Sequence, residues 1–159
     1  MGKLLAAIGV VVAAVSVYLY WASDERQIAR LLDDVTDAVS QGEGESGVAG
    51  LAEITSLTPH LAKEIAVDVT PPESGQLRGA QDVVSMVGRL RAVFPIVQLT
   101  LIGPQVTVAS DRTAQVTGSA TLLMRDKEGA EAVETRRVTI SLQERDGRWV
   151  IVYVSASST

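Results

Sequence analysis

Residues able to do chemistry are few in this sequence, and their spacing does not form a familiar catalytic motif. His60 is the single histidine, and Glu64, four residues later, could place two metal ligands on one face of a helix. A third ligand is missing, because Asp68 would come within reach only if the segment were extended. The simpler interpretation is an exposed histidine beside Pro59, so we predict no metal and no cofactor.

A glycine-rich stretch, Gly42-Glu-Gly-Glu-Ser-Gly47, matches the spacing of a dinucleotide-binding loop. However, it follows a predicted helix instead of a strand. It also places two carboxylates where a pyrophosphate would bind. We therefore interpret the stretch as a connector between two helices.

The composition excludes several classes of site and partner. The chain has no cysteine, which rules out disulfides, thiolate-bound zinc, iron–sulfur clusters and covalently attached haem. Nineteen acidic residues outnumber fourteen lysines and arginines, and the charges are spread without blocks. Such a surface argues against nucleic acid as a partner and against docking on anionic lipid.

An uncharged apolar run from Leu4 to Ser23 is long enough to cross a bilayer as one helix, which predicts a transmembrane anchor over residues 1–23. Three of the six aromatic residues gather at the end of this run: Tyr18, Tyr20 and Trp21. They are typical of a membrane interface. They also disfavour the alternative, a cleaved signal peptide, which needs small residues near its cleavage site.

The short head carrying Lys3 predicts an N-terminus inside the cell. The following domain would then be periplasmic, at a bacterial-type inner membrane. Small residues at helical spacing form a stripe on the predicted anchor: Ala6, Gly9, Ala13 and Ser16. This stripe could let another transmembrane helix approach closely, although small residues are also common filler in such helices.

Residues 24–159 are predicted to form one α+β domain. Apolar residues at helical spacing indicate helices over 24–41, about 48–57 and 83–94, and alternation indicates a short strand over 65–70. Four antiparallel strands follow, near 96–109, 112–125, 133–146 and 148–157, with turns too short for crossover helices. Gly103-Pro104 interrupts the first of them, where we expect a bulge.

Alternation within these strands predicts two unlike faces. The inward face is apolar: Ala114, Val116, Gly118, Ala120, Leu122 and Met124, continued by Val138, Ile140 and Leu142. The opposite face is polar but uncharged: Thr113, Gln115, Thr117, Ser119 and Thr121, continued by Thr139, Ser141 and Gln143. We predict that it binds a protein partner, because such a face loses little solvation on contact. The alternative is that threonine is simply a good strand former.

The order of these elements, with the hairpin and closing strand Asp146-Gly-Arg-Trp-Val-Ile-Val-Tyr-Val154, resembles the nuclear transport factor 2-like (SnoaL-like) superfamily. The resemblance implies a cone-shaped, curved antiparallel sheet packed on about three helices. Members include isomerases, dehydratases, transport factors and domains of membrane-anchored secretion components. Its enzymes need an Asp or His in an apolar cone. Asp68 with Tyr153 is the candidate pair, although Tyr153 is more simply a core residue.

Together these features predict a non-catalytic, single-pass accessory subunit of a larger membrane complex of respiratory, photosynthetic or secretion type. Its partners would be transmembrane protein subunits, bound through the helix stripe and the sheet face. One alternative is a membrane-tethered carrier or sensor that holds a small apolar ligand in the cone. A third is an isomerase- or dehydratase-type enzyme. The sequence leaves the oligomeric state open.

Overall fold

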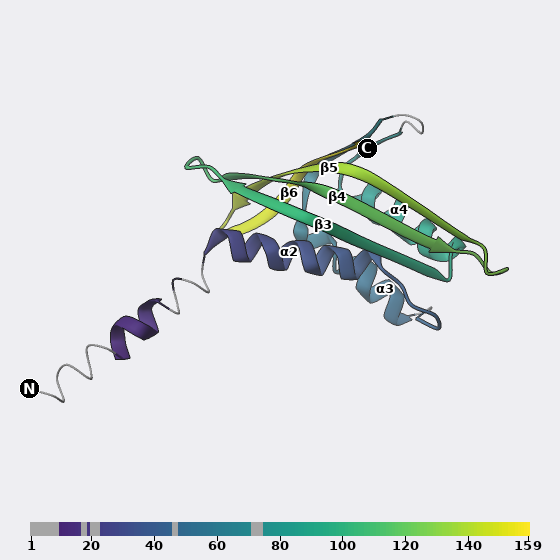
Figure 1. The fold of residues 1–159 in the computed structure, drawn as a ribbon, viewed down its shortest axis with the longest axis horizontal. Helices are drawn as coiled ribbons and strands as arrows, with labels where there is room; N and C mark the ends of the chain where they lie inside the picture. Colours follow the sequence, from purple (N-terminus) through teal and green to yellow (C-terminus); the bar gives the residue numbers. More distant parts are fainter. Residues whose placement is uncertain (1–9, 17–18, 20–22, 46–47, 71–74) are drawn as a thin grey trace, which may run out of the picture.

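The computed structural model describes residues 10–16, 19, 23–45, 48–70 and 75–159. Its helices lie on one side of a six-stranded sheet with the strand order β2-β1-β6-β5-β4-β3 (Figure 1). The helices are α2 (Asp24–Val39), α3 (Val48–Thr55), the 3-10 helix η1 (Thr58–His60) and α4 (Ala80–Val93). The strands are β1 (Leu61–Val69), β2 (Gly75–Arg78), β3 (Ile96–Val108), β4 (Thr113–Arg125), β5 (Glu131–Arg145) and β6 (Arg148–Ser158).

Helix α2 packs against the sheet because its apolar residues recur at helical spacing and form one stripe. Ile28, Leu31, Leu32 and Ala38 on this stripe are buried. The helix ends at Ser40, whose backbone N–H and hydroxyl both donate to the carbonyl of Thr36. The chain then joins the sheet edge, where Gln41 exchanges backbone hydrogen bonds with Val97 of β3.

The long strands follow the predicted ranges to within two residues at each end, and the bulge expected at Gly103-Pro104 is confirmed. Ile102 pairs with Ser119, but the next β3 residue in register is Gln105, which pairs with Thr117. Gly103 takes up a φ of 60°, which glycine adopts without strain. A side chain at Gly118, opposite the bulge, would lie 3.0 Å from the carbonyl oxygen of Ile102, a tight contact that favours glycine there.

A second irregularity lies in β6, between the pairs Leu142–Ile151 and Ser141–Tyr153. One step along β5 therefore corresponds to two steps along β6, which leaves Val152 as the extra residue of a bulge. The bulge reverses which face alternate residues occupy. Ile151 faces the helices with Leu142, whereas Tyr153 faces away with Ser141.

Between the helices and the sheet lies one apolar core. Ile28, Leu57, Ile65, Val116 and Leu142 are almost completely buried in it. The helix-facing sheet residues predicted from alternation are buried only at one end of the strands, at Ala114, Val116, Val138, Ile140 and Leu142. Beyond Gly118 the same face is half-buried, because the long hairpins extend past the helices. The prediction of a curved sheet packed on helices is confirmed.

The predicted transmembrane helix is contradicted. Within the described part of the chain, no helix is long and apolar enough to cross a membrane. The prediction of a single-pass membrane subunit at an inner membrane, with its tethered-carrier alternative, was wrong on the same ground.

Candidate functional site

The interior of the cone offers no obvious acid or base among its described residues. The helix-facing rows of the sheet are aliphatic across β3, β4 and β5, as in the row Val106–Val116–Ile140. Charge appears only toward the open end, where Arg136 pairs with Glu134 and its Nη1 donates to the carbonyl of Thr70 over 2.7 Å. Glu134 and Arg136 border an apolar hollow of about 230 Å³ over Ala120 and Leu122.

Asp68 and Tyr153 do not enter the cone. The register pairs Ala66 with Tyr153 and Asp68 with Ser155, so both side chains lie on the outer face of the sheet. Asp68 forms an ion pair with Arg78 of β2, with Oδ1 and Nη2 3.3 Å apart. The structure therefore does not place this pair in an apolar pocket, and the idea that Tyr153 is a core residue was also wrong, since the Val152 bulge turns it outward.

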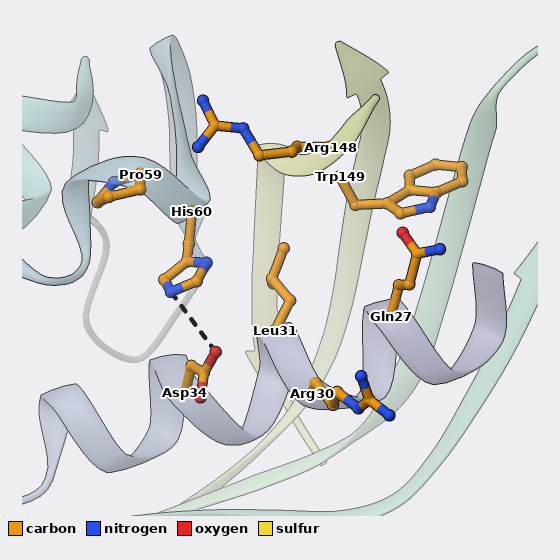
Figure 2. Close-up of a pocket in the computed structure, with 8 residues that line it drawn as sticks. All are labelled: Gln27, Arg30, Leu31, Asp34, Pro59, His60, Arg148 and Trp149. Atoms are coloured by element: carbon orange, nitrogen blue, oxygen red, sulfur yellow. Dashed lines mark ion pairs between the residues drawn. The ribbon is translucent and has the colours of Figure 1, made fainter. Parts of the chain in front are cut away.

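His60 and Glu64 are not paired either, because η1 ends at His60 and Glu64 already belongs to β1. Glu64 forms an ion pair with Arg145 at the end of β5. His60 instead faces Asp34 of α2, with Nε2 and Oδ2 3.8 Å apart (Figure 2). No cluster of three potential metal ligands occurs in the ranges that the structure describes.

The His60–Asp34 contact forms one wall of an open hollow of about 240 Å³, which we call the His60 hollow. Three segments line it: Gln27, Arg30, Leu31 and Asp34 of α2, Pro59 and His60 of η1, and Arg148 and Trp149 of β6. Figure 2 shows the side chain of Arg148 extending from β6 toward η1, with Leu31 at the centre and Trp149 on the other side. Sequence reasoning missed this site because its three segments are far apart in the chain.

A buried polar network joins the helices at the opposite end of α2. The Arg91 side chain, 2% exposed, donates to Oε1 of Gln41 at 2.9 Å, to the carbonyl of Ala38 at 2.9 Å and to Glu53 at 2.7 Å. The Gln41 amide nitrogen in turn reaches the carbonyls of Arg91, Phe94 and Pro95. The side chains of Arg91 and Gln41 thus bond to each other, to Glu53 and to carbonyls at the ends of α2 and α4, which indicates a structural role for this cluster.

The outer face of the sheet carries the predicted polar surface. Three cross-strand rows define what we call the outer rows: Thr107–Gln115–Ser141–Tyr153, Gln105–Thr117–Thr139–Ser155 and Ile102–Ser119–Arg137–Ser157. Thr113 with Gln143 and Thr121 with Thr135 extend them at the two ends. The described helices contact the sheet from the other side, which leaves the outer rows uncovered (Figure 1).

The residues predicted to bind a membrane partner lie largely beyond the described structure. Ala6, Gly9, Tyr18, Tyr20 and Trp21 fall outside it. Ala13 and Ser16 lie in the exposed helical segment 10–16, which projects away from the domain (Figure 1).

Comparison with known proteins identifies the family. The profile described as a SnoaL-like domain matches residues 22–155, and the chain therefore belongs to the SnoaL-like domain family. No curated protein matches the chain significantly.

Solved structures share the fold at low sequence identity. A protein of Novosphingobium aromaticivorans provisionally named a scytalone dehydratase superposes with a TM-score of 0.69 and 14% identity, covering 86% of this chain and 84% of its own. A provisionally named aromatic ring hydroxylase of the same organism gives 0.70 and 13%, with 85% and 88% covered. The association domain of C. elegans CaMKII gives 0.61 and 17%, with 84% and 95% covered. At these identities the likeness shows the fold alone.

Proposed function

We propose that this domain is a non-catalytic self-association module, in which the outer rows of two copies pack against each other. The observation that carries the proposal is the composition of those rows. Of their twelve residues, Arg137 alone is charged, and the others are mostly hydroxyl and amide side chains. A solvated sheet face of an acidic protein would carry more charge than this.

Hydroxyl and amide groups suit contact with a copy of the same surface. Each can both donate and accept a hydrogen bond, so one row can satisfy its own counterpart. A two-fold interface uses the same patch on both partners and therefore requires such self-complementarity. Because the chain carries a net charge of −5, two copies avoid repulsion best at the outer rows, which hold no carboxylate; Asp68 beside them on β1 is paired with Arg78.

The size of the surface is compatible with a stable pair. With strands about 4.8 Å apart and a rise of about 3.3 Å per residue, four strands of nine residues cover roughly 600 Å² before side-chain relief is counted. Typical specific interfaces bury about 800 Å² on each partner. Exposed aliphatic side chains on the same face, Ile102 (54% exposed) and Val133 (61%), would add apolar burial.

The non-catalytic part of the proposal is supported by the cone interior described above, where Glu134 and Arg136 neutralise each other at the open end. The names of the fold relatives include both an enzyme and an association module: one is provisionally a dehydratase, and another is an association domain. The chemistry of the outer rows favours association for this chain.

Sedimentation of the full chain tests the proposal. We expect a dimer whose population rises with protein concentration. Thr117→Glu should weaken this dimer by about tenfold or more, because the interface would bury the new carboxylate, unpaired, near the same carboxylate of the second copy. Thr117 is exposed, and its neighbours across the strands are Gln105 and Thr139, so the folded monomer should accept the change.

Gln81→Glu is the matched control, since it adds the same charge at an exposed position of α4 on the helix side of the sheet. It should leave the dimer unchanged. A monomer at every accessible concentration would refute the proposal. So would a dimer that tolerates Thr117→Glu, because association would then involve another part of the chain.

A further inference from the structure

The His60 hollow lies on the helix side of the sheet and takes no part in the proposed pairing of outer rows. Its residues on α2, Gln27, Arg30, Leu31 and Asp34, follow the i, i+3, i+4, i+7 spacing of one helix face. The neighbouring residues of α2, Ile28 and Leu32, are buried in the core, so this face is held in place by packing.

The hollow combines an apolar floor with positive charge. Leu31 and Trp149 are each 5% exposed and form the floor, and the Trp149 indole N–H donates to Asp24 over 3.3 Å, which fixes the ring. Arg148 contributes a permanent positive charge, and the two nearby carboxylates are already engaged, Asp34 with His60 and Asp24 with the indole N–H. On a chain of net charge −5, the Arg148 guanidinium makes this hollow a place that attracts anions.

The volume limits the size of the ligand. About 240 Å³ corresponds to roughly eight water molecules at about 30 Å³ each. Sites for drug-sized ligands typically enclose about 300–1,000 Å³. A small molecule with one anionic group and a short apolar body fits both the space and the lining.

We propose that the His60 hollow binds a small organic carboxylate with a flat apolar body. The guanidinium of Arg148 binds the carboxylate, since its fork of N–H donors matches two carboxylate oxygens. The apolar body lies on Leu31 and against the Trp149 ring. His60, held beside Asp34, closes the side toward η1.

NMR titration of the full chain with benzoate tests the proposal. The chain has two tryptophans, so the indole N–H signal of Trp149 can be followed with that of Trp21 as an internal reference. We expect benzoate to shift the Trp149 signal in a saturable manner. Benzamide, which has the same shape without the charge, should bind at least about tenfold more weakly, as should inorganic phosphate, which lacks the apolar body.

Three arginine variants separate specific binding from general attraction. Arg148→Gln should weaken benzoate binding about tenfold or more, and Arg148→Lys, which keeps the charge, should retain part of the affinity. Arg89→Gln, an exposed arginine of α4, should change nothing. The proposal is overturned if benzoate does not saturate, if benzamide binds equally well, or if Arg148→Gln binds as tightly as Arg89→Gln. Unfolding curves will show that each variant is folded before its affinity is compared.

Discussion

The two faces of the sheet are made by the same strands, yet they differ in chemistry along the part of the strands that the helices cover. On β5, Val138, Ile140 and Leu142 face the helices and are buried, whereas the intervening Thr139 and Ser141 face outward and are half-buried. Backbone conformation and strand pairing are shared by the two sets. The difference therefore arises from side chains alone, and it shows that one face stabilises the fold while the other is available for contact.

Two bulges keep most apolar residues on the helix-facing side, and most polar residues on the outer side, along β3 and β6. In β3 the inward residues are Leu99 and Leu101 before Gly103-Pro104, but Val106 and Val108 after it. The Val152 bulge does the same in β6, where the outward residues become Tyr153, Ser155 and Ser157. Without these bulges, hydroxyl groups would enter the core and aliphatic groups would face outward.

The sharpest test of the comparison uses two neighbours on β5. Leu142→Ala should lower the free energy of unfolding by about 2–5 kcal/mol, because it leaves a cavity in the core. Ser141→Ala, one residue earlier on the outer face, should change it by less than about 0.5 kcal/mol. Urea unfolding curves measure both. Equal losses at the two positions would show that the outer face is buried in the free protein.

A smaller effect is expected at the buried Arg91. Arg91→Met should cost about 2–3 kcal/mol, because Gln41 and the carbonyl of Ala38 lose a charged donor inside the protein. Arg89→Met, on the exposed side of the same helix, is the matched control and should be nearly neutral. If thermal unfolding finds the two variants alike, the network does not stabilise the packing of α2 and α4.

The smallest effect concerns the surface pair of Glu64 and Arg145. The pKa of Glu64 is lowered chiefly by the hydrogen bond from the Arg145 side chain. A lowered folded pKa stabilises the protein above the unfolded pKa, and this contribution is lost as pH falls through the folded value. NMR titration of the Glu64 carboxyl should therefore show its pKa return toward normal in Arg145→Gln. An unchanged pKa would mean that the pair does not persist in solution.

Much of this fold could be predicted from the sequence, because the deciding signals are local. Alternation located β3 to β6, and Pro95 and the turn at Asp146-Gly147 marked where elements end. The polar and apolar sets of β4 and β5 were separated correctly by their period of two, which strand geometry imposes.

The rest depends on contacts between distant segments. Strand β2 (Gly75–Arg78) has Leu77 as its single large apolar residue and forms by pairing with β1. The first residues of β1 lack alternation and join β6 through the pair Leu61–Ile151. The Arg91 network and the His60 hollow also bring together segments that are far apart in the chain, so local patterns do not predict them. The apolar run at the start of the chain predicted a membrane helix from composition alone, and the described structure contradicts it.

The position of β6 also has a consequence for how the protein is made. This strand follows all the others in the chain, yet it lies between β1 and β5 and joins the β1–β2 pair to the β3–β5 meander. On the ribosome, both parts are synthesised before the strand that unites them, and each exposes an unpaired edge until β6 emerges. We therefore expect folding to be completed late, with β1 and β5 as the edges most in need of protection from aggregation while the chain is growing.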